Sequence, residues 1–349
     1  MNSSGKEKHE QKEYMERLQM DLEAVDETTA KEILQDFADH FDQGLSEGRS
    51  EEEISAELGD PAELISELNT RPHHQSQTEA QPDASSLSAV VIEADSADIT
   101  LRQGNGSEVL VEFYDSRNPL RVHNYRLDTF QEGDIYHIHV HRLQNSWLRA
   151  GAGEHLRLDV TLPAACLDIK ITGMSGDIRL REAISCGKLA VVTQSGDIEI
   201  RALDAEAVQL TSTSGDIQAA VRGELVQVAS VSGDLDIAQA EGKLGKFRTT
   251  SGDLKVQGCF QAMLAESKSG DLDLSIEEAE SLKLDTISGD IHLKLPRTTG
   301  FLCSFSTISG DLGQHIGLPL QRQGRQLRAG DGHAQIAVKT ISGDFKISD

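Results

Sequence analysis

Aromatic residues, proline and long apolar runs are scarce in this sequence. Its 349 residues include one Trp, four Tyr, nine Phe and seven Pro. Few aromatic rings leave few platforms on which bases or sugars could stack. No run of 18 apolar residues occurs, so we expect no membrane-spanning helix. The polar N-terminus has no apolar core segment, so we expect no signal peptide and a cytoplasmic protein.

Positive charge is also scarce. The chain has 33 Lys and Arg against 58 Asp and Glu, a net charge of −25. Such a chain repels phosphate backbones and anionic lipid surfaces, so we expect no nucleic-acid partner. The charge is uneven, because residues 1–70 hold 6 basic and 20 acidic residues, a net charge of −14.

Cysteine is rare and scattered. Cys166, Cys186, Cys259 and Cys303 form no Cys-x-x-Cys pair. This spacing predicts neither a disulfide framework nor a zinc site. Reduced thiols in a cytoplasmic protein fit it best.

Residues 1–70 have the patterns of a small acidic helical domain. Apolar residues recur at helical spacing and predict one buried helix face at Ile33, Leu34, Phe37, Phe41 and Leu45. We expect Phe37 and Phe41 to be core residues rather than a docking patch.

Two helix starts follow in the same domain. Ser50 and Glu53 form a capping box for a helix that Gly59 ends. Asp60 and Pro61 begin another helix, with Leu64, Ile65 and Leu68 on its apolar face. Residues 71–88 have no periodicity and predict a flexible linker.

Glycine, in contrast, is plentiful, and it belongs to an internal repeat within residues 89–349. Ser-Gly-Asp followed by Ile, Leu or Phe occurs nine times, at spacings of 20, 19, 18, 19, 18, 19, 21 and 33 residues. The glycines and aspartates of these copies are Gly176 and Asp177, Gly196 and Asp197, Gly215 and Asp216, Gly233 and Asp234, Gly252 and Asp253, Gly270 and Asp271, Gly289 and Asp290, Gly310 and Asp311, and Gly343 and Asp344. A period near 19 residues predicts a solenoid.

The repeat unit alternates apolar and polar residues on both sides of a turn, as half-buried strands do. We predict a mainly β fold, a parallel β-solenoid of about nine to eleven coils, with regular coils over residues 170–349. Glycine gives freedom for a tight corner, aspartate accepts N–H bonds there, and both are predicted as structural turn residues. Hydroxyl ladders of Ser and Thr between coils are also expected.

The irregular parts of the repeat give three further expectations. Degenerate copies occur at residues 96–99 and 133–135. The 33-residue spacing contains an insertion at about residues 314–333. The last repeat, residues 341–349, has no capping helix, so we expect an open edge there and either a dimer or a capped end.

Two patterns could bind metal. Stacked corner aspartates could form a row that binds calcium, although one Asp per 19 residues is sparse for that role. His137, His139 and His141 share one strand face, which suits a metal, but no carboxylate or cysteine partner is identifiable. Structural turns and a solvated histidine row are the favoured interpretations, so we expect no metal and no cofactor.

An enzyme is not expected. Parallel β-helices include enzymes that act on polysaccharides, and these need a unique carboxylate pair or basic cluster. The prominent acids here are repeated, and no nucleophile elbow, phosphate loop or dinucleotide motif occurs in its required context.

The repeat resembles a bacterial family of β-solenoids whose members are described as putative adhesins. The similarity rests on the pattern Thr/Ser-x-Ser-Gly-Asp-Ile/Leu and covers about residues 89–349. Its best copies are residues 193–198, 213–217, 249–254, 286–291, 307–312 and 340–345.

Residues 1–70 look like the HAAS signalling domain of Gram-positive bacteria. The similarity rests on residues 37–41, Gly48, residues 50–54 and residues 58–61. The resemblance implies regulator or membrane-protein partners, and the pairing of both domains resembles Bacillus proteins linked to envelope stress. Two function classes follow: a cytoplasmic interaction protein that binds a partner through residues 1–70, or an exported surface adhesin.

Overall fold

The computed structural model describes residues 7–22, 34–35, 37–38, 41–42, 44–46, 48–58, 60–61, 87–115, 125–142, 156–164 and 167–349. The chain divides into two compact units. One consists of residues 1–77 and 117–123, and the other of residues 78–116 and 124–349. Each unit is described by itself.

The first unit is helical. Helix α1 (Glu7–Asp21) and helix α3 (Glu51–Leu58) are joined by a bond from the Gln11 backbone N–H to the Glu51 carboxylate, at 2.9 Å. Tyr14 of α1 packs against Phe37 and Phe41, which are both buried as predicted, with ring centroids 6.0 and 5.6 Å away. These aromatic rings share the core of the described part of this unit with the buried side chains of Leu18 and Ile54.

The predicted capping box starts α3. The Ser50 N–H donates to the Glu53 carboxylate at 3.0 Å, and the Glu53 N–H donates to Ser50 Oγ at 3.2 Å. These two bonds satisfy N–H groups that have no partner inside the helix. The apolar face predicted at Leu64, Ile65 and Leu68 lies outside the described residues.

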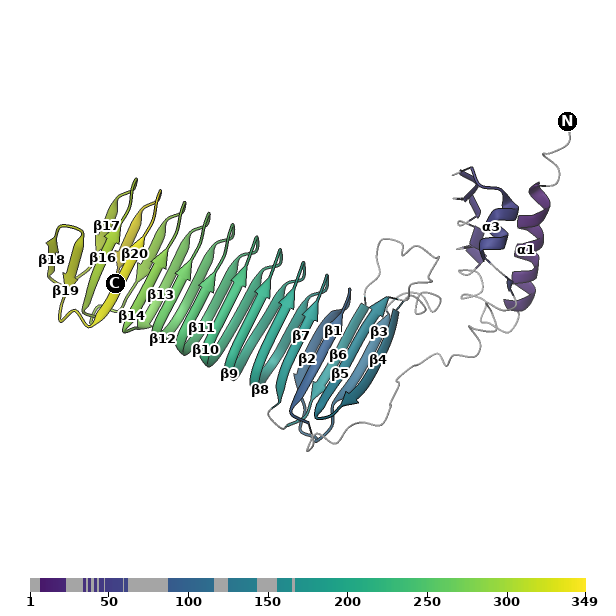
Figure 1. The fold of residues 1–349 in the computed structure, drawn as a ribbon, viewed down its shortest axis with the longest axis horizontal. Helices are drawn as coiled ribbons and strands as arrows, with labels where there is room; N and C mark the ends of the chain where they lie inside the picture. Colours follow the sequence, from purple (N-terminus) through teal and green to yellow (C-terminus); the bar gives the residue numbers. More distant parts are fainter. Residues whose placement is uncertain are drawn as a thin grey trace. The chain divides into compact units, whose positions relative to one another are not determined.

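The second unit is a rod of stacked coils, as the period of the repeat predicts (Figure 1). Its first seven strands are β1 (Ala89–Ala94), β2 (Asp98–Gln103), β3 (Leu110–Asp115), β4 (Tyr125–Glu132), β5 (Ile135–Arg142), β6 (Leu156–Leu162) and β7 (Asp168–Gly173). The next seven are β8 (Ile178–Thr193), β9 (Ile198–Ser212), β10 (Ile217–Ser230), β11 (Leu235–Arg248), β12 (Leu254–Glu266), β13 (Leu272–Glu278) and β14 (Ser281–Asp285). The last are β15 (Ile291–Lys294), β16 (Phe301–Ser306), β17 (Leu312–His315), β18 (Leu320–Gln323), β19 (Gln326–Ala329), β20 (Ala334–Lys339) and β21 (Phe345–Ser348).

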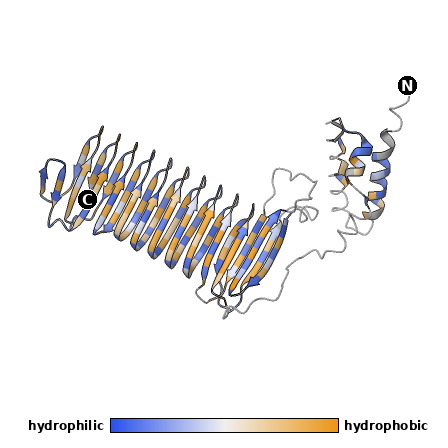
Figure 2. Cartoon of the chain, viewed as in Figure 1, coloured by the Kyte–Doolittle hydropathy of each residue, from blue (hydrophilic) through white to orange (hydrophobic). Residues whose placement is uncertain are grey.

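Strands β8 to β12 each pair in parallel with the equivalent strand of the next coil. Each coil has one arm after the Ser-Gly-Asp corner and a second arm before the next corner, with a register shift between them. Inward and outward residues alternate along both arms: Ile198, Ile200, Val208 and Leu210 are buried. Figure 2 shows the resulting orange and blue stripes along the rod. The core is thus one narrow aliphatic layer enclosed by each coil.

The N-terminal end of the rod does not follow chain order. Strands β1 and β2 lie second in the stack, between β5 and β7 on one arm and between β6 and β8 on the other. Antiparallel strands cover the outer layer, with β4 on β5 and β3 on β6. The copy predicted at residues 133–135 is wrong as a solenoid corner, because Gly133, at φ 64°, lies in the hairpin turn between β4 and β5.

The C-terminal end also departs from chain order. Strands β20 and β21 lie between β14 and β16 on one arm and between β15 and β17 on the other. The last repeat in the sequence is therefore an inner layer, and the open edge predicted at residues 341–349 is wrong. The expected insertion at about residues 314–333 contains the hairpin β18–β19, in which β19 pairs antiparallel with β16.

The corner glycines allow neighbouring coils to approach closely. A Cβ added to Gly215 would lie 2.1 Å from the carbonyl oxygen of Gly196, and one added to Gly233 would lie 2.0 Å from that of Gly215. Corner glycines from Gly176 to Gly289 have no positive φ. Glycine is needed at these corners because backbone lies against backbone, and not because the chain adopts a left-handed φ there.

A corner alanine should therefore destabilise the rod. We expect Gly215→Ala to lower the free energy of unfolding by about 1–3 kcal/mol, because the new methyl group forces two coils apart. Urea denaturation followed by circular dichroism measures this change. Gly106→Ala is the matched control, since its Cβ would meet nothing closer than 4.0 Å. Equal stability of the two variants would contradict this role of the corner.

Candidate functional site

The corner aspartates form one continuous hydrogen-bonded ladder. The backbone N–H of Asp197 donates to Asp177 Oδ1 at 3.1 Å, and that of Asp216 donates to Asp197 Oδ1 at 2.9 Å. Nine such bonds join ten aspartates in the spatial order Asp98, Asp177, Asp197, Asp216, Asp234, Asp253, Asp271, Asp290, Asp344 and Asp311. With the outer β5–β6 layer, this order corresponds to eleven coils.

Four successive corners, from Gly196 to Gly252, are also closed within their own coil. The N–H of Gly215 donates to Ser212 Oγ at 2.8 Å, and that of Gly252 donates to Thr249 Oγ1 at 3.1 Å. These hydroxyl groups are buried, and each accepts the backbone N–H of the glycine three residues later in the chain. At these corners the hydroxyls make local turns instead of the expected bonds between coils.

The carboxylates of the corner aspartates have a structural role, because they hold neighbouring coils together. In nine of the ten aspartates, Oδ1 accepts an N–H from the next coil. Among the residues that the structure describes, no group of three or more His, Cys, Asp or Glu side chains is placed to hold a metal ion.

We expect the loss of one ladder carboxylate to weaken the stack. Asp234→Ala leaves the Asp253 N–H without its 2.8 Å acceptor and should lower the free energy of unfolding by about 1 kcal/mol. Asp234→Asn is the control, because its amide oxygen can still accept that bond. Chemical denaturation of both variants measures the difference. If both variants lose the same stability, the carboxylate acts by charge and not as an acceptor.

The three histidines lie on the outward face of β5, as their alternation predicts. The structure also shows partners that the sequence did not reveal. Nε2 of His139 lies 3.6 Å from Glu93 on β1, and Nε2 of His141 lies 3.7 Å from Asp128 on β4. His137 stacks on Phe130 with centroids 4.8 Å apart. His139 also packs edge-on against Phe130 and against His137, with ring centroids 5.2 and 5.7 Å away.

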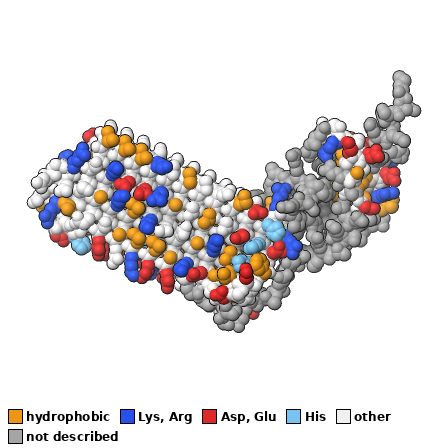
Figure 3. All heavy atoms as spheres, viewed as in Figure 1, with side chains coloured by type: hydrophobic (Ala, Val, Ile, Leu, Met, Phe, Trp, Pro, Cys, Tyr) orange, Lys and Arg blue, Asp and Glu red, His pale blue; other side chains and the backbone are white. Residues whose placement is uncertain are grey.

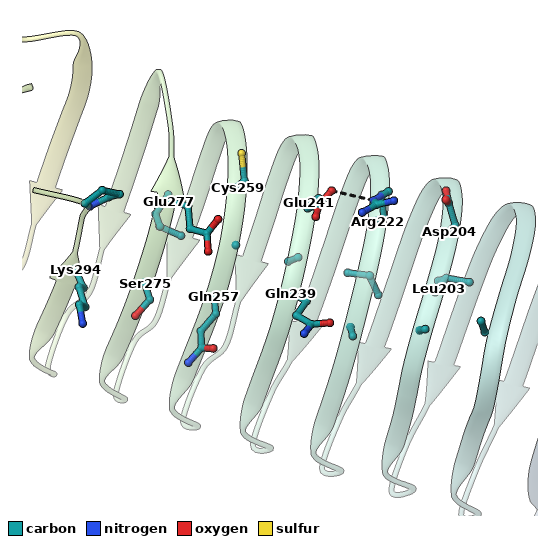
Figure 4. Close-up of a pocket in the computed structure, with 18 of the residues that line it drawn as sticks. Leu203, Asp204, Arg222, Gln239, Glu241, Gln257, Cys259, Ser275, Glu277 and Lys294 are labelled. Carbon is teal, nitrogen blue, oxygen red and sulfur yellow. Dashed lines mark hydrogen bonds and ion pairs between the residues drawn. The ribbon is translucent and has the colours of Figure 1, made fainter. Parts of the chain in front are cut away.

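A groove runs along successive coils where their strands bend. It encloses about 1220 Å³. Each coil from β8 to β12 has a register shift at this place, and such bulges bend a strand. Equivalent residues of successive coils therefore line the groove in two rows (Figure 4). One row includes Gln239, Gln257, Ser275 and Lys294, and the other Asp204, Arg222, Glu241 and Cys259.

Charges in the groove are mixed. Arg222 of one coil bonds to Glu241 of the next at 2.9 Å, and this bond raises the pKa of the arginine. Carboxylates, amides and hydroxyls lie along its length, which suits hydrogen bonding to an extended chain. The groove was not predicted from the sequence, although a break in the alternation of buried and exposed residues at Arg201–Ala202 marks the bend.

Cys259 lies in this groove. Its pKa is raised mainly by burial and also by Glu278, whose carboxylate lies 4.0 Å from Sγ. Cys303 is buried in β16, and burial raises its pKa to about 12. Cys259 and Cys303 are free thiols, whereas Cys166 lies outside the described residues.

Both raised pKa values predict slow alkylation. A raised thiol pKa leaves less thiolate at a given pH, and the thiolate is the nucleophile. We expect iodoacetamide at pH 8 to label Cys259 more slowly than the unfolded chain and to leave Cys303 unlabelled until unfolding. Peptide mapping by mass spectrometry follows each cysteine separately. Glu278→Gln should accelerate labelling of Cys259, and an unchanged rate would show that this carboxylate has no influence.

Comparisons with known proteins agree with this architecture. The family model Toastrack DUF4097 matches residues 87–348, and the model HAAS matches residues 13–67. No curated protein matches the sequence. None of the described helices is long and apolar enough to cross a membrane.

Two crystal structures are similar to this chain. One, described as a putative cell adhesion protein, comes from Clostridium sporogenes; it is 9% identical, with a TM-score of 0.21, over 77% of this chain and 96% of its own. The other, described as a putative adhesin, comes from Bacteroides fragilis; it is 14% identical, with a TM-score of 0.39, over 76% of this chain and 94% of its own.

Proposed function

Because the chain belongs to the Toastrack DUF4097 family and carries a HAAS domain, we propose that it is a non-enzymatic interaction protein. Its HAAS domain binds a regulator or a membrane protein, and the rod presents a long rigid surface. The observation that carries this proposal is the uneven charge. Residues 1–70 have a net charge of −14, which strongly favours a basic partner surface.

The described part of the HAAS domain supports this role. Asp42 and Glu52 are exposed, and neither has an ion-pair partner among the described residues. Glu53, in contrast, is used by the capping box, and Glu51 is buried at the contact with α1. The carboxylates of Asp42 and Glu52 are therefore available to a partner.

Several features favour a cytoplasmic scaffold in signalling or the envelope-stress response. Cys259 and Cys303 are free thiols, which suits a reducing compartment. The repeated carboxylates serve the coil stack, and the charged groove residues Arg222 and Glu241 are paired with one another. These arrangements favour binding over catalysis.

The test is affinity purification of the full chain from its host, with quantitative mass spectrometry. We expect Asp42→Lys with Glu52→Lys to lose the partner at least about tenfold, because a like-charge surface then faces it. The control is Glu132→Lys with Glu206→Lys, two exposed rod residues with the same charge change. Partners retained equally by both double variants would contradict the role of the HAAS domain.

Cell fractionation tests the location. We expect the chain in the cytoplasmic fraction or held at the inner side of the membrane by its partner. Recovery outside the membrane would contradict the scaffold proposal and favour a surface adhesin.

A further inference from the structure

At the C-terminal end of the rod, one arm of the stack extends further than the other, so the end has the shape of a step. On one arm β16 is followed by two more strands, β19 and then β18. On the other arm β17 pairs with β21 and with no further strand that the structure describes. Half of the backbone N–H and C=O groups of β17 therefore face outward without a strand partner, and its sequence, Leu-Gly-Gln-His, carries no Asp, Glu, Lys or Arg that would discourage pairing.

The aspartate ladder ends at the same place with one acceptor unused. The N–H of Asp311 donates to Asp344 Oδ1 at 2.8 Å. The carboxylate of Asp311 receives no such bond from the described residues, whereas the other nine ladder carboxylates each accept one. The last coil thus presents the group on which a further coil would dock.

An apolar row leads to this end. Ile287, Ile341 and Ile308 precede the serines of three successive corners, which pair in parallel register. Ile308, at the end, is 83% exposed, against 47% for Ile287 and 42% for Ile341. It is the most exposed of the large hydrophobic side chains that the structure describes. Leu312 and Ile316 nearby are only partly buried.

The hairpin β18–β19 brings unpaired positive charge to this end. Arg322, Arg325 and Arg328 are exposed, and no carboxylate of a described residue lies within ion-pair distance of them. Arg322 and Arg328 donate only to the backbone oxygens of Gly324 and Asp331. Lys and Arg side chains are visible at this end of the rod in Figure 3.

We propose that this end binds a second copy of the chain, related by a two-fold axis. The step is self-complementary, because the two extra strands of each copy fill the space beyond β17 of the other. The edge of β18 then meets the edge of β17, and the hairpin arginines of one copy face Asp311 of the other. Because this end carries both basic and acidic groups, it favours an identical partner. The two-fold rotation brings the arginines of each copy to the aspartate of the other at the same time.

The assembly closes at two copies. At the opposite end of the rod, antiparallel β3 and β4 cover the outer layer on both arms. A two-fold interface uses the same surface of both copies, so its formation leaves no free surface of that kind for a third copy. This self-association goes beyond the partner binding proposed for residues 1–70 and uses none of those residues, so either proposal can fail alone.

Sedimentation velocity of the full chain tests the proposal. We expect a monomer–dimer equilibrium at micromolar concentrations, and Ile308→Glu should weaken the dimer at least about tenfold. Ile287→Glu is the matched control, because it occupies the same corner position two coils inside the end; its dissociation constant should stay within about twofold. Circular dichroism verifies that these exposed substitutions preserve the fold.

A charge series tests the hairpin. Changing Arg322, Arg325 and Arg328 together to Glu should also weaken the dimer at least about tenfold. The control changes Arg181, Lys246 and Lys268 to Glu, which are exposed residues elsewhere on the rod with the same total charge change. A wild-type monomer at about 100 μM, a dimer insensitive to Ile308→Glu, or equal effects of variant and control would overturn the proposal.

Discussion

Close stacking of backbone at one corner is the constraint on which the rod depends. Each Ser-Gly-Asp corner lies so near the previous one that a Cβ on its glycine would meet a carbonyl oxygen. At that distance the aspartate N–H reaches the carboxylate of the preceding coil. The same side chain that ends one turn therefore positions the next, and the coils can differ elsewhere as long as the corner is kept.

Because the coils can differ away from the corner, their interior and surface residues vary along the rod. Inside, each coil buries a narrow aliphatic layer, and Phe247 and Phe260 are accommodated as neighbours with centroids 5.5 Å apart. Outside, ion pairs join neighbouring coils, as Arg222 does with Glu241 and Lys255 with Asp236 at 3.4 Å. The bend opposite the corner repeats from coil to coil, and its repetition makes a groove that no single coil has.

The regular parts were predictable from the sequence because they are local. A period near 19 residues predicted the parallel coils, and Ser50 with Glu53 predicted the start of α3. The ends were not predictable, because pairing over long separations decides them. The Asp344 N–H bonds to Asp290, 54 residues away, and no local pattern distinguishes that pairing from a last coil stacked after Asp311. The carboxylates beside His139 and His141 come from other strands for the same reason.

The inserted end coil changes what trimming the chain would do. In a solenoid whose coils follow chain order, loss of the final repeat removes only the outermost layer. Here residues 334–349 form the layer beneath the last one, so their loss would separate β16 and β17 from the rest of the stack. During synthesis, the coil of β16 and β17 must wait for residues made later before it has a surface to join. The end of the rod is therefore complete only when β20 and β21 have been inserted between the coil of β14 and β15 and the coil of β16 and β17. The coils at this end cannot be added in the order of the chain.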